Sequence, residues 1–166
     1  GIETLDKKNK FFNDYYANEN GINSRLDEIQ STLLNIKLKY VDKNIEKRKK
    51  IANYYITQLK DTNLIMPFEN KNCSHVYHLF TVYHTKGSLI LKKLLKKNIQ
   101  PRKIYPHSIH KMKAYKYLNK NFINNLHNTE IISKGIFCLP LYPDLKVSDM
   151  KKITQNLKKI LKKNKW

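Results

Sequence analysis

Apolar residues recur at alternating steps of three and four positions in the first third of the chain. They are Leu26, Ile29, Leu33, Ile36 and Tyr40. This spacing brings side chains onto one face of a helix, because a helix turns once in about 3.6 residues. The pattern predicts a helix with one buried face, preceded by a loop in residues 1–20, which are polar and show no such repeat.

The start of this helix has residues that favour a helix N-terminus. Ser24 is a candidate N-cap, and Asp27 then stands at the third helical position with Glu28 beside it. Acidic side chains interact favourably with the positive end of the helix dipole. The helical pattern extends to about Leu59, with an expected kink between Val41 and Lys43. A helix of this length is expected to pack across a subunit or domain boundary.

Shorter elements alternate in the rest of the chain, after a polar stretch with Pro67 that is typical of a linker. β-Branched and aromatic residues predict strands, and apolar stripes with capping residues predict helices. The expected elements are a strand at His75 to His84, a helix capped by Ser88 and ended by Asn98, a strand at Gln100 to Tyr105, a helix from about Asn125 to Gly135, a short strand at 136–140 and a last helix capped by Ser148. We therefore expect an α/β fold, with a loop and long helix in residues 1–65 and a small α/β domain in residues 66–166.

The chain is strongly basic, with 33 Lys and Arg against 13 Asp and Glu and a formal net charge of +20. Such a charge is compatible with nucleic acid or an anionic surface as a partner. Only Arg25, Arg48 and Arg102 are arginines, although proteins that bind phosphates and bases favour the bidentate guanidinium group. The excess of Lys, accompanied by Asn and Ile, is typical of A+T-rich codons. We therefore keep a lysine-rich nucleic-acid-binding domain only as a third alternative.

The cysteines and histidines do not predict a metal site. Cys73 and Cys138 are too few and too far apart for a disulfide framework or a zinc pattern. His75 and His78 lie near Cys73, but on a strand these two positions point to opposite faces. Because no apolar stretch approaches the length of a membrane span and no signal peptide is found, we expect a cytoplasmic protein without a membrane partner.

Five sequence blocks occur in an order that resembles one enzyme family. The blocks are GINSRLDEIQ with the helix that follows it, RKKIANYY, HVYHLF, YPHSIHKMKAY and LPLYPDLKVSDM. Together they resemble the C-terminal half of the DegT/DnrJ/EryC1/StrS sugar aminotransferases, over nearly the whole chain. The resemblance implies the C-terminal part of a fold-type-I, pyridoxal-phosphate-dependent transferase, in which a long helix precedes a small α/β domain with a short, mostly antiparallel sheet.

The resemblance also implies an activity for a full-length parent protein. Members of the family form homodimers and transfer an amino group, usually from glutamate, to a keto group of a nucleotide-linked deoxysugar, often for polysaccharide biosynthesis. Their Schiff-base lysine lies in an N-terminal large domain, which also makes most contacts with pyridoxal 5'-phosphate. None of the lysines here stands in that motif, so we expect no catalytic residue in this chain and no activity from the fragment alone.

Two polar residues on the loop before the long helix are candidate cofactor-binding residues. In the family this loop crosses the dimer interface, and its asparagine helps to hold the cofactor phosphate of the neighbouring subunit. The resemblance thus implies phosphate binding by Asn23, with Arg25 beside it. An amide and a guanidinium group near a helix start offer directed hydrogen bonds and positive charge to a phosphate. The alternative is that Asn23 only forms a turn and Arg25 is an exposed first-turn residue.

A second group, Tyr105, His110 and Tyr115, matches a family loop that lines the sugar-nucleotide pocket. Pro106 stiffens the approach to this loop, and Lys111 stands where relatives often have glutamine. The alternative is a surface loop whose tyrosines pack on the domain. For the whole protein, the alternatives are a pyridoxal-phosphate-dependent sugar dehydratase and a noncatalytic relative of the same fold. The sequence does not identify the keto sugar or the carbon that is aminated.

Overall fold

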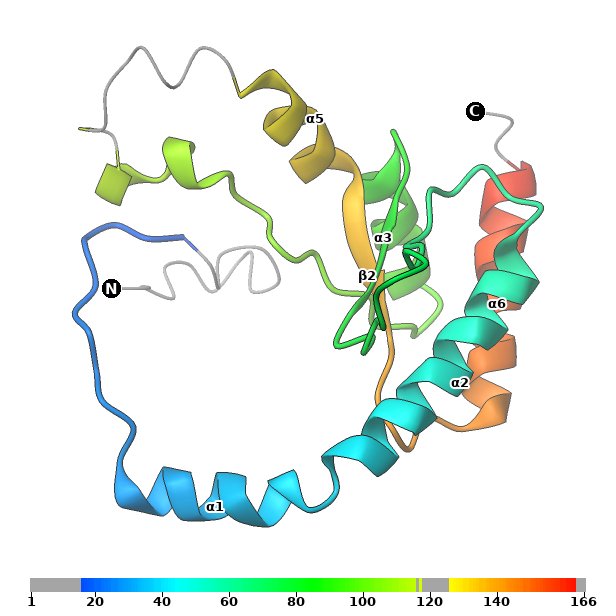
Figure 1. Ribbon diagram of the computed structural model, residues 1–166. Coiled ribbons are helices and arrows are strands. Elements are labelled where there is room, and N and C mark those ends of the chain that lie inside the picture. The colour runs from blue at the N-terminus through cyan, green and yellow to red at the C-terminus, as the bar shows by residue number, and fades with distance from the viewer. Residues whose placement is uncertain (1–15, 116, 118–125, 164–166) are drawn as a thin grey trace.

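The computed structural model describes residues 16–115, 117 and 126–163 (Figure 1). Helices dominate, and a small antiparallel sheet lies among them. The elements are α1 (Glu28–Leu38), α2 (Val41–Leu59), β1 (Phe80–Tyr83), α3 (Gly87–Leu95), the 3-10 helices η1 (Ile109–Lys111) and η2 (Lys113–Tyr115), α5 (His127–Gly135), β2 (Ile136–Leu139) and α6 (Val147–Lys163). This arrangement confirms the predicted fold class.

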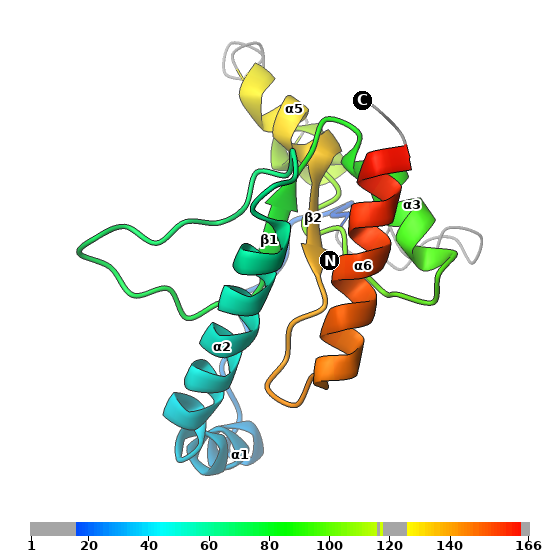
Figure 2. The same ribbon diagram turned by 90° about the vertical axis from the view of Figure 1, so that its right-hand side faces the viewer.

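The hydrophobic core forms around the two-stranded sheet. Strands β1 and β2 pair in antiparallel register, with Phe80 opposite Leu139 and Tyr83 opposite Ile136. Figure 2 shows α2, α3 and α6 beside this sheet. The largest fully buried side chains come from these helices and strands, and they are Tyr55, Leu59, Phe80, Val82, Ile90, Leu91, Leu94, Phe137, Thr154 and Leu157. The second half of α2 therefore packs in the same core as the elements that follow Pro67.

The first strand is shorter than the sequence predicts. Only Phe80–Tyr83 pairs in β1, whereas the prediction began at His75. Tyr77 has a φ angle of 46°, which is outside the extended region, and its backbone N–H donates to His75 Nδ1 at 2.8 Å. This local turn takes the chain out of strand geometry before β1. His75 and His78 therefore do not lie on a strand, contrary to the prediction.

The predicted strand at Gln100 to Tyr105 is reduced to one isolated bridge. Arg102 and Cys138 exchange both backbone hydrogen bonds, at 3.0 and 2.7 Å. Pro140 explains why the pairing stops on one side, because it has no N–H to donate at the next hydrogen-bonding position, opposite Gln100. The segment lies along the edge of β2 without becoming a third strand.

The long predicted helix is two helices, and its N-cap is Asp27 instead of Ser24. The Asp27 carboxylate accepts from the Gln30 N–H at 2.7 Å, whereas the Ser24 hydroxyl donates to the carbonyl of Arg25. Helix α1 ends at Leu38 and α2 begins at Val41, so the break falls immediately before the expected kink.

The predicted buried face of α1 is exposed. No residue of this helix is buried, and its apolar side chains face solvent in the described chain. The exposed fractions are 57% for Leu26, 76% for Ile29, 54% for Leu33, 51% for Ile36 and 58% for Tyr40. Figure 1 shows α1 extending away from the sheet, so none of the core elements covers it. The apolar residues thus form one face of the helix as predicted, but no described residue covers that face.

The remaining helix ends are close to those predicted, but the capping residues differ. Helix α3 begins at Gly87 after the N-cap Lys86, and the Ser88 hydroxyl instead donates to the carbonyl of Lys134 at 2.8 Å. Helix α6 begins at Val147, so Ser148 lies within its first turn. Helix α5 ends at Gly135 as predicted, and the predicted start near Asn125 falls outside the described residues.

Burial of His84 makes stability depend on pH. The side chain is 4% exposed, and its Nδ1 accepts the Lys86 backbone N–H at 2.9 Å. Desolvation, with a smaller effect of the Lys86 charge, lowers the pKa of His84 below its ordinary value of 6.5. As the pH falls through 6.5 the unfolded chain takes up this proton first, so stability that is fully present above that pH is lost below it.

We therefore expect the free energy of unfolding to fall between pH 7.5 and 5.5 more steeply in the wild type than in a His84→Gln variant, because glutamine does not titrate. Urea denaturation at several pH values measures both slopes. Equal slopes would show that His84 is not buried in its neutral form.

Candidate functional site

The two predicted cofactor-binding residues lie on the loop before α1. Asn23 and Arg25 are both exposed, and within the described chain neither side chain has a hydrogen bond or ion pair. Figure 1 shows this loop running along the outer side of the molecule to α1. An amide and a guanidinium group without partners on an exposed loop are free to donate to a group outside this chain.

The start of this loop is attached to the segment that contains the second predicted group. The Ala114 N–H donates to the carbonyl of Ala17 at 3.1 Å, and the Lys113 N–H donates to the Tyr16 hydroxyl at 3.1 Å. The Tyr16 and His107 rings meet edge to face, with centroids 5.2 Å apart. The structure thus connects the start of the Asn23 loop with residues 107–114, although the two are far apart in the sequence.

The three predicted substrate-binding residues have different environments. Tyr105 is 63% exposed. The His110 side chain is 11% exposed, whereas Tyr115 is half-buried and its N–H donates to the carbonyl of Met112 at 3.0 Å, which closes the turn at η2.

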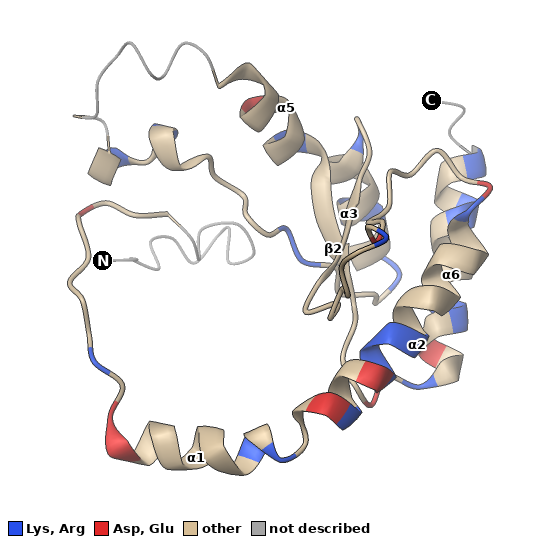
Figure 3. Ribbon diagram, viewed as in Figure 1, with Lys and Arg blue, Asp and Glu red and all other residues tan. Residues whose placement is uncertain are grey.

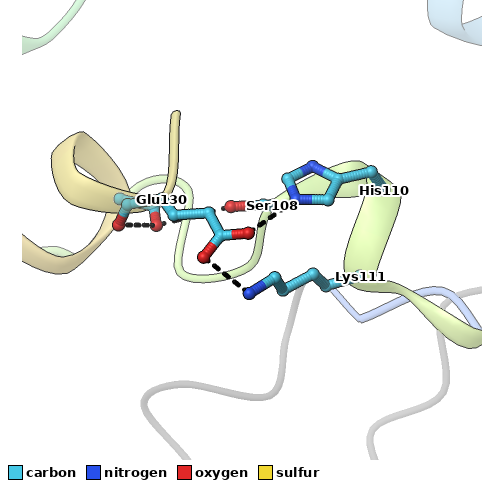
Figure 4. Close-up of polar contacts among 5 residues, drawn as sticks. Ser108, His110, Lys111 and Glu130 are labelled. Carbon is cyan, nitrogen blue, oxygen red and sulfur yellow. Dashed lines mark hydrogen bonds and ion pairs between the residues drawn. The ribbon is translucent and has the colours of Figure 1, made fainter. Parts of the chain in front are cut away.

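A polar cluster formed by Ser108, His110, Lys111, Glu130 and Ser133 joins this segment to α5 (Figure 4). One Glu130 carboxylate oxygen lies 3.3 Å from His110 Nε2, and the other lies 2.7 Å from Lys111 Nζ. The Ser133 hydroxyl donates to the carbonyl of Glu130 at 3.0 Å and accepts from the Ser108 hydroxyl at 3.4 Å. Hydrogen bonds from Lys111 and then His110 lower the pKa of Glu130, which keeps this carboxyl ionised at neutral pH.

Sequence reasoning missed Glu130. The residue is twenty positions from His110, on a separate helix, and no spacing rule connects the two. The only signal in the sequence is that Glu130 is the acidic residue in the first turn of α5.

A surface groove of about 530 Å³ lies elsewhere, between the end of β2 and the start of α6. Its walls include Arg102, Leu139, Tyr142, Asp149 and Lys152, and none of the predicted site residues lines it. The groove combines apolar walls with charges of both signs, so its lining does not favour one class of ligand.

The part of the chain that the structure describes contains neither a metal-binding cluster nor a helix suited to a membrane. No group of three or more His, Cys, Asp or Glu residues there is arranged to hold a metal ion. No described helix has the length and apolar character to cross a membrane. Figure 3 shows Lys and Arg distributed over several helices and loops, with Asp and Glu on some of the same elements.

The donors on the Asn23 loop are of the kind that can bind a phosphate group. A phosphate monoester offers only acceptor oxygens near neutral pH apart from one titrating proton, and amide N–H and guanidinium groups are donors that match it. Both side chains are exposed and uncommitted to other contacts in the described chain.

Comparisons with known proteins identify a family. The family model described as the DegT/DnrJ/EryC1/StrS aminotransferase family matches residues 1–158. The chain is 33% identical over 137 residues to the dTDP-3-amino-3,6-dideoxy-alpha-D-galactopyranose transaminase of Aneurinibacillus thermoaerophilus, covering 81% of this chain and 36% of that protein. It is 32% identical over 143 residues to the dTDP-4-amino-4,6-dideoxy-D-glucose transaminase of Escherichia coli, covering 82% and 38%.

Solved structures agree with the sequence comparisons. S. venezuelae DesV superimposes with a TM-score of 0.76 and 25% identity, over 89% of this chain and 40% of that chain. NtdA of Bacillus subtilis with bound cofactor PMP superimposes with a TM-score of 0.72 and 27% identity, over 92% of this chain and 37% of that chain. This chain thus spans well under half the length of these relatives, and it belongs to the DegT/DnrJ/EryC1/StrS aminotransferase family.

Proposed function

We propose that this chain is the C-terminal portion of a cytoplasmic, homodimeric aminotransferase that moves an amino group from glutamate to a nucleotide-linked keto-deoxysugar. The family match over residues 1–158 is the observation that supports this most strongly. Relatives with both 3-amino and 4-amino products in their names lie at similar identity, so the proposal extends to the class of substrate and not to one carbon of the sugar.

In this proposal Asn23 and Arg25 bind the cofactor phosphate across the dimer interface. Bound pyridoxal 5'-phosphate supplies the carrier of the amino group and the electron-withdrawing ring. The chain's own contribution is to hold the phosphate by directed hydrogen bonds and positive charge. The exposure of both side chains supports a role toward a neighbouring subunit, since neither is occupied within the described chain.

The sugar-nucleotide contacts in the proposal come from Tyr105, His110 and Tyr115. The exposed Tyr105 ring offers an apolar face on which a sugar or base packs. His110 is held by Glu130 and can form one further hydrogen bond through its second ring nitrogen. The start of the Asn23 loop contacts residues 107–114. These contacts connect the loop that carries the proposed phosphate-binding residues to the segment that carries the proposed substrate-binding residues.

The exposed apolar face of α1 also fits this proposal. A helix with such a face is normally covered by another surface. We propose that the loop before α1 and α1 itself pack on the large domain and the partner subunit. The small domain then consists of residues 66–166 together with the second half of α2, which shares their core. The large domain then contributes the catalytic lysine and most of the cofactor contacts, so the fragment alone is inactive.

A noncatalytic relative is the second candidate, and one comparison favours it. The chain is 27% identical over 146 residues to the "Pleiotropic regulatory protein" of Geobacillus stearothermophilus. A sugar dehydratase of the same fold is a further branch. The residue at the Schiff-base position of the full-length protein and an assay of amino transfer separate these candidates.

The assay uses the full-length protein with pyridoxal 5'-phosphate, ¹⁵N-labelled glutamate and dTDP-linked 3-keto and 4-keto deoxysugars. We expect one of the two sugars to gain the labelled amino group, detected by mass spectrometry, because the family chemistry moves nitrogen without releasing it. Formation of a deoxygenated sugar without nitrogen would instead show the dehydratase. A cofactor-loaded protein with a Schiff-base lysine that leaves both sugars unchanged would contradict the proposed substrate class.

A further inference from the structure

We propose that Glu130 is a positioning residue that holds His110 in one tautomer, so that the ring presents Nδ1 as a hydrogen-bond acceptor to a hydroxyl group of the sugar substrate. The identity of the substrate rests on the proposed function. The geometry of the pair is a property of the chain itself.

The direction of the His110–Glu130 hydrogen bond follows from the chemistry of the two groups. Hydrogen bonds from Lys111 and His110 lower the pKa of Glu130, so the carboxylate is ionised near neutral pH. An ionised carboxylate only accepts hydrogen bonds, so the contact of 3.3 Å to Nε2 requires the proton to be on Nε2. In neutral His110 the other ring nitrogen, Nδ1, then has a lone pair and acts as an acceptor.

The carboxylate is itself held at both oxygen atoms. Oε1 accepts from His110 and Oε2 accepts from Lys111 Nζ at 2.7 Å. Two contacts in different directions restrict rotation of the carboxylate, and with it the orientation of the imidazole ring. The Ser133 hydroxyl links the backbone of Glu130 to Ser108, two residues before His110. Figure 4 shows these contacts joining η1 to α5 from two sides.

His110 Nδ1 is left without a partner. Figure 4 shows this second ring nitrogen facing away from the Glu130 carboxylate, and within the described residues it makes no hydrogen bond. The side chain is 11% exposed, and Nδ1 is not one of its fully buried atoms, so a donor from outside the chain can reach it. An acceptor in this position selects a ligand that donates there, such as a sugar hydroxyl, and disfavours an analogue without that hydroxyl.

Nuclear magnetic resonance of the chain tests the tautomer without any activity. The chain is labelled with ¹⁵N-histidine and studied at pH 8, where an ordinary imidazole is neutral, and His110→Gln assigns the signal. We expect the proton on Nε2, as a slowly exchanging N–H that is lost in Glu130→Ala. Glu130→Gln keeps an acceptor oxygen of similar reach and should retain the signal. Glu46→Gln, the same change at a surface pair with Lys49, is the matched control.

A proton on Nδ1, a doubly protonated ring at pH 8, or a signal that does not respond to Glu130→Ala would overturn the proposal. A variant that merely unfolds would change all histidine signals together. In that case Glu130→Gln decides, because it preserves size and shape.

Substrate kinetics of the full-length enzyme test the second half of the proposal. Glu130→Ala and His110→Ala should each raise KM for the nucleotide sugar about tenfold, the effect of one lost hydrogen bond, with a smaller change in kcat. The double variant should be no worse than His110→Ala, because Glu130 acts through that ring. Effects that multiply to about a hundredfold, or a KM that does not change in Glu130→Ala, would overturn it.

The two experiments separate this proposal from the proposed function. If the full-length protein aminates no nucleotide sugar, the proposed function fails, and the ring-proton measurement still decides whether Glu130 sets the tautomer. If amination occurs and the ring proton is on Nδ1, only the inference about Glu130 fails.

Discussion

Replacing Phe80 with alanine is expected to lower the free energy of unfolding by about 3 to 5 kcal/mol. The side chain is fully buried and stands at the start of β1, opposite Leu139. Its ring centroid lies 5.2 Å from that of Tyr55 and 6.3 Å from that of Tyr77. The substitution removes apolar burial and leaves a cavity between the sheet and α2.

Phe68→Ala is the matched control, because the same residue type is 85% exposed at that position. Urea denaturation of both variants should show a large drop in midpoint for Phe80→Ala and a change within about 0.5 kcal/mol for Phe68→Ala. Similar losses in both variants would mean that the core around the β1–β2 pair is not what stabilises the chain.

The fold class and the order of helices followed from the sequence, because they depend on apolar periodicity. The helices around Leu33, Tyr55, Leu91 and Leu157 all appear near their predicted positions. Capping residues were harder to predict. Ser24 and Asp27 both have a side-chain oxygen that can accept a hydrogen bond at an N-cap, so backbone geometry decides which of them caps the helix. The Asp27 cap was recognisable only from its contact with Gln30.

The strands were overestimated for a different reason. β-Propensity describes side chains that fit a pleated surface, but pairing also needs a partner and free N–H groups. His75 and Tyr77 form a local turn, and Pro140 limits the pairing beside Arg102. The apolar periodicity of α1 was predicted correctly, whereas burial was not, since burial requires a surface that these residues do not provide.

The candidate site was only partly accessible to sequence reasoning. The family motif drew attention to Asn23, Arg25 and His110, but the contact between His110 and Glu130 depends on how α5 packs. Contacts between separate elements are not encoded in local spacing. For the same reason the attachment of Ala17 to Ala114 could not be predicted.

In the full-length enzyme, Asn23→Ala is expected to weaken retention of pyridoxal 5'-phosphate by about 1.5 to 3 kcal/mol, the value of a hydrogen bond to a charged group. This corresponds to roughly a 10- to 150-fold higher Kd. The protein should stay folded, because Asn23 is exposed and packs on nothing in the described chain. Cofactor titration followed by absorbance measures the change, and Asn53→Ala, at an exposed position on α2, is the control.

The central claim, that Asn23 serves the partner's cofactor site, is tested most directly by mixing two inactive or weakened enzymes at limiting cofactor. One carries Asn23→Ala, and the other lacks the Schiff-base lysine. If Asn23 acts across the interface, each mixed dimer has one site with both lesions and one intact site, because each site takes its lysine from one subunit and Asn23 from the other. Mixing should then restore amino transfer. If Asn23 acts within its own subunit, every site of the mixed dimer carries one lesion, and no gain in activity on mixing would contradict the claim.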